Sequence, residues 1–392
     1  MKFVLAVDVG GTTIKAEIAD ESGAVVRNGS VPTPKGAAAL DAVAALGASL
    51  IASCDSPVTG AGVILPGIVD RTRRIAVYSA NIGWSDLDAG PPLDRAWGIP
   101  VAIDHDVTCA GWAEWMTGAG QGCSDMAFVA IGTGISAALV SGGRLLRGAG
   151  SRQPGEIGHV VVRPDGPACG CGARGCVEAV ASASSIARAY AAMTGSPVAG
   201  ALDVERAAAH DDRARKVWDD AIAALADGLA VLTTLLAPER IVLGGGLAMS
   251  GSFLLDPLVP ALASRVCVQP VPELVTARYG MRAGLAGAAL LAAGQAQYQQ
   301  LRNTWPRSTF SSRPDSDFCG GSPHCGDFGV VHVWHPSAKR RNSALFRHRA
   351  SSRRLSRFRR LSVSVRERSA TPLCSGRSAR LTSSSDHVRF RA

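Results

Sequence analysis

The sequence has no run of eighteen apolar residues, so nothing in it predicts a membrane-spanning helix. Its N-terminus also lacks the pattern of a secretory signal, because the apolar run after Lys2 reaches the charged Asp8 too soon. The ten cysteines show no paired extracellular spacing. These absences together predict a protein of the reducing cytoplasm that has no membrane partner.

The first 294 residues lack the basic excess of a nucleic-acid-binding protein. They contain 22 Lys or Arg and 27 Asp or Glu, which gives a net charge of −5. The last 98 residues contain 19 Lys or Arg and 5 acids, so the +9 of the whole chain belongs to this tail. We therefore expect no nucleic acid to bind the body of the protein, whose 47% hydrophobic content is typical of a globular α/β fold.

The tail over residues 295–392 is rich in Arg, Ser and His and has neither a helical nor a strand period. This composition predicts a disordered appendage. The alternative is that its basic runs, such as residues 353–360, bind nucleic acid or acidic lipid.

One imidazole and three thiols form a compact set in the middle of the chain. His159 is followed by Cys169, Cys171 and Cys176, with glycines between the cysteines where the backbone must turn tightly. This ligand set suits tetrahedral zinc, and because all four positions are filled we predict a structural ion. Such a site can contribute roughly 10 kcal/mol of folding free energy.

Two glutamates bracket this predicted zinc loop. Glu156 lies three residues before His159, and Glu178 lies two residues after Cys176. A metal that fixes the loop would hold both carboxylates rigidly toward a polyhydroxylated ligand. The alternative is that both glutamates are solvated and the loop is only a staple.

A Gly-Gly turn with hydroxyls joins the first two predicted strands. Bare backbone N–H groups in such a turn can hold phosphate oxygens, a carboxylate at the strand end can hold hydrated Mg²⁺, and a lysine can lie near phosphate. The alternative is an ordinary tight hairpin. The candidate residues are Asp8, Gly10, Gly11, Thr12, Thr13 and Lys15.

The same pattern of strand, glycine–threonine turn and strand recurs after the predicted strand 126–131, where Gly132, Thr133 and Gly134 lead into another strand. Two such units predict two loops that close on the phosphates of one nucleotide. A third glycine run, residues 244–246, follows the predicted strand 241–243. It would lie near the nucleoside, and the alternative is a flexible turn, which the glycines alone would favour. The last predicted helix spans 283–293 and consists of small residues that favour tight packing.

Polar residues follow the predicted strand 99–103 and precede a helix, which is where open α/β sheets place their ligands. Asp106 is our candidate general base, which would accept a proton from a sugar hydroxyl as that oxygen attacks phosphorus. Asp is also a favoured N-cap residue, and the local sequence does not decide between these two roles.

These motifs together resemble the bacterial sugar kinases of the ROK family (repressor, open reading frame, kinase), of the glucokinase and N-acetylmannosamine kinase type. The resemblance covers residues 1–294 and is most specific at Gly155–His159 and Cys169–Glu178. It implies a two-lobed actin-like ATPase (ribonuclease H-like) α/β fold with ATP and sugar in the interlobe cleft. The lobes would comprise residues 1–115, completed by helix 283–294, and residues 116–282.

The resemblance also implies the site. Mg·ATP would contact the glycine turns and Asp8, and His159 would serve zinc and sugar through its two ring nitrogens. A homodimer or homotetramer is implied as well. The implied sugar-binding residues are Pro66, Gly67, Asn81, His105, Asp106, Glu156, His159 and Glu178.

The chain departs from the family pattern at several places. His105 stands where the family commonly has Asn, which contacts a sugar hydroxyl, and Ser136 and Ala137 stand where the second turn usually has more glycines. The chain begins directly on its first nucleotide-binding strand, without the DNA-binding segment of the repressor branch, and this favours an enzyme.

We expect ATP-dependent phosphorylation of a hexose at its 6-hydroxyl, with glucose as the first candidate. N-acetylmannosamine and other hexoses or N-acetylhexosamines are alternatives. They differ from glucose in substituents that only a few side chains would contact. A catalytically weak, sugar-responsive regulator is the alternative of another class.

Overall fold

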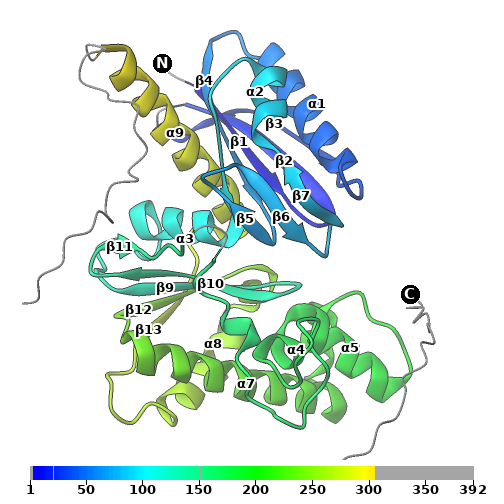
Figure 1. The fold of residues 1–392 in the computed structure, drawn as a ribbon. Coiled ribbons are helices and arrows are strands. Elements are labelled where there is room, and N and C mark those ends of the chain that lie inside the picture. The colour runs from blue at the N-terminus through cyan, green and yellow to red at the C-terminus, as the bar shows by residue number, and fades with distance from the viewer. Residues whose placement is uncertain (1–2, 21, 150–151, 305–392) are drawn as a thin grey trace, which may run out of the picture. The chain divides into compact units, whose positions relative to one another are not determined.

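Two five-stranded mixed sheets organise the chain (Figure 1). The computed structural model describes residues 3–20, 22–149 and 152–304, so the expected disorder of 305–392 lies outside the described residues. The strands are β1 Phe3–Val9, β2 Thr13–Ala19, β3 Val25–Pro32, β4 Val58–Leu65, β5 Ile68–Asp70, β6 Ile75–Ser79, β7 Trp84–Asp88, β8 Val101–His105, β9 Met126–Ile131, β10 Ile135–Ser141, β11 Arg144–Leu145, β12 Arg240–Gly244 and β13 Glu273–Thr276.

The α-helices connect and cover these strands. They are α1 Ala38–Ala52, α2 Gly90–Trp97, α3 Asp106–Thr117, α4 Val177–Ala181, α5 Ala183–Thr194, α6 Ala201–Ala207, α7 Asp212–Leu236, α8 Ser252–Ala263 and α9 Ala283–Thr304. Three short 3₁₀ helices span Ile157–His159, Gly246–Ser250 and Gly280–Arg282. None of the helices within the described ranges is both long and apolar enough to cross a membrane.

The two large sheets share one topology. The first has the order β3-β2-β1-β4-β8 and the second β11-β10-β9-β12-β13. In each, an antiparallel hairpin (β1–β2 or β9–β10) is followed by parallel strands. The two glycine–threonine turns therefore occupy equivalent positions, because each joins the central strand of its sheet to the neighbouring antiparallel strand. β5, β6 and β7 form a small third sheet, in which Trp84 is buried as a packing residue.

Alternation along β1 explains why the first sheet is covered on both faces. Leu5 and Val7 belong to a buried cluster with Leu40 and Val43 of α1, whereas Ala6 belongs to a cluster on the other face with Leu285 and Ala288 of α9. Successive side chains of a strand point to opposite faces, so a nearly continuous apolar run predicts burial on both. The last helix of the described chain thus packs against its first strand.

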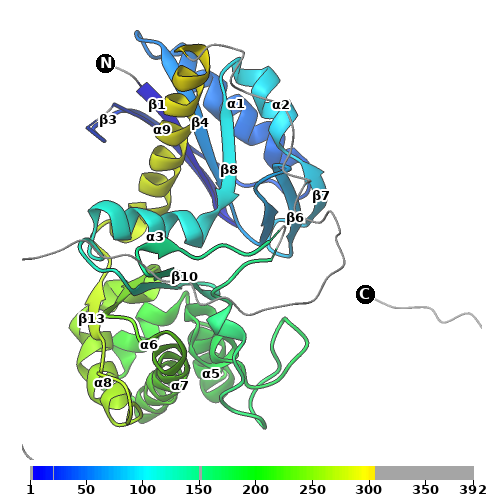
Figure 2. The same ribbon diagram turned by 60° about the vertical axis from the view of Figure 1, so that its left-hand side comes forward.

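Helix α9 lies along β1 and β4 (Figure 2), and its small residues and those of its neighbours allow a close approach. A Cβ added to Gly62 of β4 would lie 2.0 Å from the carbonyl oxygen of Ala288, and one added to Gly287 would lie 2.2 Å from the carbonyl oxygen of Cys109. Neither site can accept a side chain without moving backbone. The tight packing that the small-residue composition predicts for this helix is confirmed.

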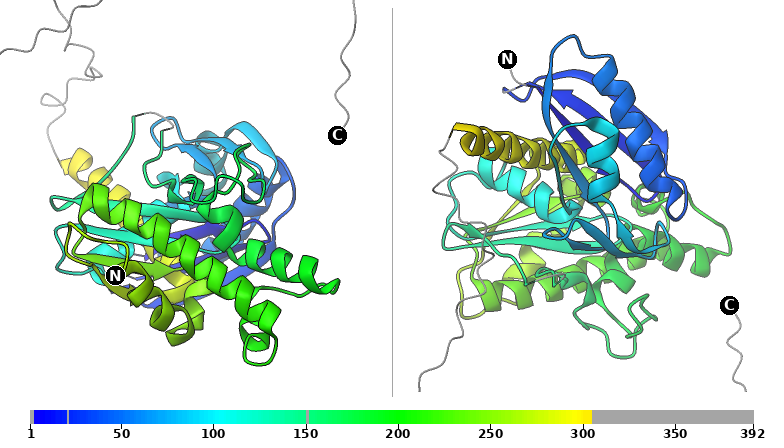
Figure 3. Two further views of the ribbon diagram at one scale, coloured as in Figure 1. Left: turned by 90° about the horizontal axis from the view of Figure 1, so that it is seen from below. Right: turned by 45° about the horizontal axis from the view of Figure 1, so that its top comes forward.

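The second sheet is also sandwiched (Figure 3). Ala127, Val129 and Ile131 of β9 face a cluster that includes α7, whereas Met126 and Phe128 face a cluster that includes Ala110 of α3. Helix α7 begins after Asp211, whose side chain caps the first turn by accepting from the Arg213 amide.

Helix α3 holds the chain segment that leads into α9. The buried carboxylate of Glu114 accepts the backbone N–H of Ala119 (2.8 Å), Arg278 (3.0 Å) and Tyr279 (2.8 Å). Three amide donors on one carboxylate satisfy a charge that would otherwise be costly to bury. This arrangement fixes α3 against the entrance to α9.

The predicted boundary of the tail is wrong by ten residues, or nearly three helical turns. The composition changes at Gly294, but α9 continues to Thr304. Residues 295–304 are mostly Gln, Ala, Leu and Arg, which favour helix, and the next proline comes only at position 306. The prediction placed the boundary where the apolar content of the sequence falls. The helix propensity does not fall at the same position, so the helix continues.

Candidate active site and metal centre

The first glycine turn closes the β1–β2 hairpin. The N–H of Gly10 donates to the carbonyl of Thr13 at 3.0 Å, and a Cβ on Gly10 would lie 2.8 Å from that oxygen. Thr33, just after β3, donates its hydroxyl to the carbonyl of Gly10 and its N–H to the carbonyl of Thr12. The turn is thus held from one side, and its exposed residue Thr12 can face a ligand.

Asp8 lies next to this turn and opposite Lys15 in the β1–β2 register. Burial, together with the nearby charge of Asp106, raises the pKa of the Asp8 carboxyl to about 7, although the charge of Lys15 lowers it. A Cβ on Gly284 would lie 2.7 Å from Asp8 Oδ2, so the start of α9 closely approaches this carboxylate. Asp8 therefore lies where β1, α3 and α9 converge, although it remains partly exposed.

We expect Asp8→Asn to stabilise the nucleotide-free protein more at pH 8 than at pH 4. The unfolded carboxyl ionises near pH 4, whereas the folded one keeps its proton up to about 7. The folded state thus binds more protons in this window, and wild-type stability falls as the pH rises through it. Urea unfolding of both proteins between pH 4 and 8 measures the difference, which should grow up to about pH 7. A difference that does not change with pH would contradict the expectation.

His105, rather than Asp106, caps helix α3. The backbone N–H of Thr108 points to His105 Nδ1 at 3.4 Å, and Asp106 is the first helical residue. The N-cap role, which the local sequence left open for Asp106, therefore belongs to His105. The side chain of Asp106 is 32% exposed, and its Oδ1 accepts from the Val107 amide at 2.6 Å and contacts His105 Nε2 at 3.1 Å.

The carboxyl ends of three parallel strands meet at one edge of the first sheet. Asp8 of β1 is in register with Ile64 of β4, and Leu65 is in register with His105 of β8. Asp8, the Pro66-Gly67 turn and Asp106 therefore share this edge, the usual position of ligands in open α/β sheets. Gly67 has a φ of +91°, and a Cβ there would lie 2.2 Å from the carbonyl of Tyr78.

Asn81 lies beside the first glycine turn. Its Cβ is 3.5 Å from the position that a Cβ on Gly11 would take, and its carbonyl accepts from Lys35 Nζ at 2.6 Å. The predicted sugar contact Asn81 and the predicted phosphate contact Gly11 are thus neighbours.

Glu178 is bonded to the second glycine turn. Its Oε2 accepts from the amide of Ile135 at 2.8 Å and lies 2.7 Å from the position of a Cβ on Gly134. Ser184 donates its hydroxyl to the carbonyl of Thr133 at 2.7 Å, which holds the turn from the other side. One oxygen of Glu178 is therefore used within the protein, and the second remains for a ligand.

The third glycine run lies against the end of β9. Gly245 has a φ of +80°, and a Cβ there would lie 2.5 Å from the carbonyl of Ile131. A cavity of about 240 Å³ opens beside it, lined by Gly244, Gly245, Ala248, Met249, Thr276 and Ala277 among others. Small, mostly apolar walls next to bare backbone suit a flat aromatic base.

The four predicted metal ligands converge. Their donor atoms, from His159, Cys169, Cys171 and Cys176, all lie within 4.8 Å of one another. The sulfurs of Cys171 and Cys176 are 3.7 Å apart, as are Cys169 Sγ and His159 Nδ1. Zinc–sulfur bonds of about 2.3 Å in a tetrahedron place neighbouring sulfurs about 3.8 Å apart, so the donor set fits this ion.

The same geometry assigns the two ring nitrogens of His159. Nδ1 faces Cys169, whereas Nε2 lies 3.9 Å from Glu156 Oε2. The nitrogen that can bind metal is thus on one side of the ring, and the other nitrogen faces the carboxylate predicted to bind sugar.

Backbone bonds fix the metal loop to the lobe beneath it. The amides of Val162 and Arg163 donate to the carbonyl of Gly175, whose φ is +68°. Arg163 also pairs with Asp227 of α7, which in turn pairs with Arg265. Burial raises the pKa of the Cys176 thiol to about 12, so this buried sulfur needs a cation in order to ionise.

Two contacts that the sequence analysis missed join the segment before Glu156 to the strand and helix that carry Asp106. Gln153 Nε2 donates to the hydroxyl of Thr108 at 2.7 Å, and Arg147 pairs with Asp104 of β8 at 2.5 Å. Each links residues more than 40 positions apart, so no local signal marks them. They bring the edge that carries Asp106 close to the Glu156 segment.

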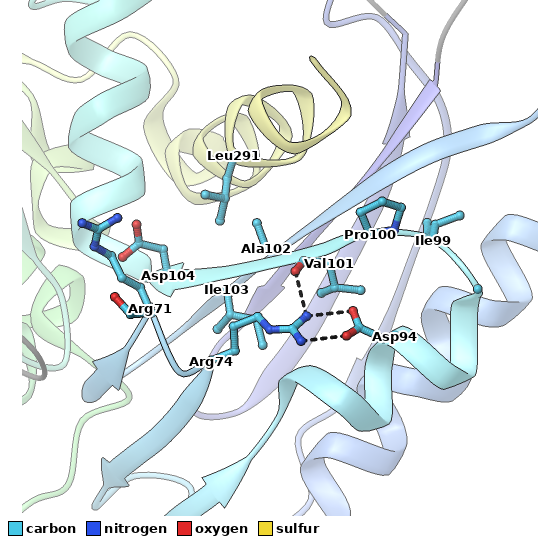
Figure 4. Close-up of a pocket in the computed structure, with 12 residues that line it drawn as sticks. Arg71, Arg74, Asp94, Ile99, Pro100, Val101, Ala102, Ile103, Asp104 and Leu291 are labelled. Atoms are coloured by element: carbon cyan, nitrogen blue, oxygen red, sulfur yellow. Dashed lines mark hydrogen bonds and ion pairs between the residues drawn. The ribbon is translucent and has the colours of Figure 1, made fainter. Parts of the chain in front are cut away.

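A larger cavity of about 760 Å³ runs along the free edge of β8 (Figure 4). Arg74 forms two bonds of 2.8 Å to Asp94 and a third, of 3.2 Å, to the carbonyl of Val101. The lining of this cavity contains none of the residues predicted to bind sugar or ATP. This cavity is therefore distinct from the predicted site.

Comparison with known proteins gives a consistent result. The matching family model is described as the ROK family and covers residues 4–295. A glucokinase of Halalkalibacterium halodurans is 34% identical over 287 residues, 66% of this chain and 84% of that protein. An N-acetylmannosamine kinase of Shigella flexneri is 31% identical over 296 residues, 74% of this chain and 99% of that protein.

Solved structures agree in fold. A ROK family glucokinase from Streptomyces griseus in complex with glucose and AMPPNP matches with a TM-score of 0.66 and 31% identity, over 74% of this chain and 99% of that one. A ROK family transcriptional regulator, a homologue of the E. coli MLC protein, matches with a TM-score of 0.67 and 26% identity, over 76% of this chain and 79% of that one. The predicted two-lobed α/β fold is confirmed.

Proposed function

Because the chain belongs to the ROK family, we propose that it is an ATP-dependent sugar kinase that phosphorylates a hexose at the 6-hydroxyl, with glucose as the first candidate. Relatives named glucokinase and N-acetylmannosamine kinase support the class. The observation that carries the proposal is Asp106, a partly exposed carboxylate held by two donors at the same sheet edge as Asp8 and the first glycine turn.

ATP would lie between the two glycine turns. The backbone N–H groups of Gly11 and Thr12 and those of Thr133 and Gly134 would donate to phosphate oxygens, since the N–H groups of Gly10 and Gly132 already bond within their turns. The cavity beside Gly244 and Gly245 would take the base. Asp8 fits a hydrated Mg²⁺, because its partly buried carboxylate needs positive charge nearby to ionise. A bound Mg²⁺ supplies charge that neutralises the transferring phosphoryl group.

The sugar would be oriented by Glu156 and Glu178, whose free oxygens can accept from its hydroxyls, and by His159. With Nδ1 of His159 on zinc, its Nε2–H would donate to a sugar oxygen. Asp106 Oδ2 would then accept the proton of the 6-hydroxyl as that oxygen attacks the γ-phosphorus in line with the leaving ADP. The roles of these chain residues are orientation of the acceptor and removal of its proton.

Zinc would be held by His159, Cys169, Cys171 and Cys176 in a closed, structural site. Its contribution would be rigidity, because Glu156 precedes the first ligand and Glu178 follows the last. The ion itself would take no part in the phosphoryl transfer.

A second candidate function is a sugar-responsive regulator of low activity. The match to a ROK family transcriptional regulator favours it, because that protein shares the fold over 76% of this chain. The same cleft residues would bind sugar in both cases, so turnover separates the two functions.

A panel of glucose, N-acetylmannosamine, N-acetylglucosamine, fructose and mannose, assayed for ADP release with the whole chain, tests the proposal. We expect one hexose to give a much higher kcat/KM than the others, and phosphorus NMR of the product to show a 6-phosphate. The matched control is the 6-deoxy form of that sugar, which should give no sugar-dependent ADP release. Sugar binding without turnover for every hexose would instead support the regulator.

A further inference from the structure

His105 is buried, and both of its ring nitrogens are engaged within the protein. Only 6% of its side chain is exposed. Nδ1 lies 3.2 Å from the Thr108 hydroxyl and 3.4 Å from the Thr108 amide nitrogen, whereas Nε2 lies 3.1 Å from Asp106 Oδ1. No nitrogen is left for a sugar hydroxyl in this arrangement.

The partners of Nδ1 determine which nitrogen carries the proton. The Thr108 amide can only donate, so Nδ1 must accept. The Thr108 hydroxyl oxygen already accepts from Gln153 Nε2 at 2.7 Å, which leaves its own proton free to donate to Nδ1 as well. The ring proton therefore lies on Nε2, where it faces Asp106.

This proton donates to one chosen oxygen of Asp106. Oδ1 receives both the His105 Nε2–H and the Val107 amide, the latter at 2.6 Å. Two donors on Oδ1 fix the rotation of the carboxylate, and among the described residues no donor lies within hydrogen-bond distance of Oδ2. The oxygen that remains free is the one that can accept a substrate proton.

The series of bonds begins outside the first sheet. Gln153 lies three residues before Glu156, on the segment that leads to the predicted sugar contacts. Every bond from Gln153 through Thr108 and His105 to Asp106 points in the same direction. The orientation of Asp106 is thus connected to the segment that carries Glu156.

We propose that His105 is a positioning residue for the base Asp106, with its tautomer fixed by Thr108 and Gln153, and that it makes no sugar contact. This inference rests on the proposed function, in which Asp106 takes the proton of the acceptor hydroxyl. It replaces the sugar-binding role that the family resemblance implied for position 105.

His105→Phe keeps the ring and removes both nitrogens, so it tests positioning against binding. We expect kcat to fall about 10- to 100-fold while the KM for the sugar changes less than about threefold, because Asp106 loses its alignment but the sugar keeps its own contacts. His105→Asn, whose amide can both cap α3 and donate to Asp106, should recover most of the lost kcat. A loss confined to KM, or an unchanged kcat in His105→Phe, would overturn the proposal.

Thr108→Val tests the series of bonds without touching the ring. It should lower kcat about 3- to 10-fold in the wild-type background and have no further effect in the His105→Phe background. Equal losses in both backgrounds would show that Thr108 acts independently of His105.

Nitrogen NMR of the histidine side chains provides a readout that needs neither turnover nor a stable Phe variant. With the His105 signal assigned by its absence in His105→Asn, we expect the Nε2–H tautomer, and an Nδ1–H tautomer would overturn the proposal. If wild-type protein phosphorylates no hexose, the proposed function fails, while this tautomer measurement still decides the bond pattern around Asp106.

Discussion

Asp106→Asn is expected to lower kcat about 10³-fold while the sugar still binds. The amide has the shape of the carboxylate, and its oxygen can still accept from Val107 and His105. Its nitrogen would occupy the position of Oδ2 and cannot take a proton from the acceptor hydroxyl. General bases typically contribute 10²- to 10⁴-fold to the rate, so the loss should fall in this range.

The measurement is kcat from ADP release together with the sugar Kd from calorimetry. Asp41→Asn is a matched control, because Asp41 also lies in the first turn of a helix, α1, but is exposed and is not one of the predicted site residues. It should leave both values within about twofold of wild type. A kcat for Asp106→Asn within tenfold of wild type would remove Asp106 from the role of base.

Cys176→Ser is expected to remove the metal, destabilise the protein and abolish turnover together. Cys176 is the buried member of the cluster, and a serine hydroxyl is a poor zinc ligand. A structural zinc site contributes roughly 10 kcal/mol, so the melting temperature should fall by about 10–20 °C. Turnover should fall because the loop that places Glu156 and Glu178 is no longer fixed.

Zinc content by elemental analysis, thermal melting and kcat are measured on the same preparations. Cys267→Ser is the matched control, because Cys267 is exposed and lies outside the cluster. It should keep about one zinc per chain and wild-type activity. Wild-type protein without zinc would contradict the proposed metal centre, and a zinc-free variant with full activity would contradict its structural role.

Features that depend on short stretches of sequence were predictable. The two hairpin turns follow from glycine and threonine between apolar strands, and the metal cluster follows from cysteine and histidine spacing, because the ligands are close in sequence. The family resemblance supplied the fold, and comparison with relatives confirms it.

Features that depend on distant contacts were not predictable. Propensity ranks Asp far above His as an N-cap, yet His105 caps α3, because Thr108 and the distant Gln153 surround its ring. The bond from Glu178 to Ile135 likewise spans 43 positions and connects a predicted sugar residue to a predicted phosphate turn. Sequence spacing carries no information about such pairs.

The packing of α9 on β1 and β4 has a consequence for synthesis on the ribosome. One apolar face of the first sheet, which includes Ala6 and Ile64, has its cover in a helix that begins only at Ala283. The second sheet, by contrast, is built entirely from strands between Met126 and Thr276. Domains generally fold N-terminal part first as they emerge. Here the first lobe cannot complete its core when it emerges, because one of its hydrophobic faces lacks α9. That face is covered only after the second lobe has left the exit tunnel.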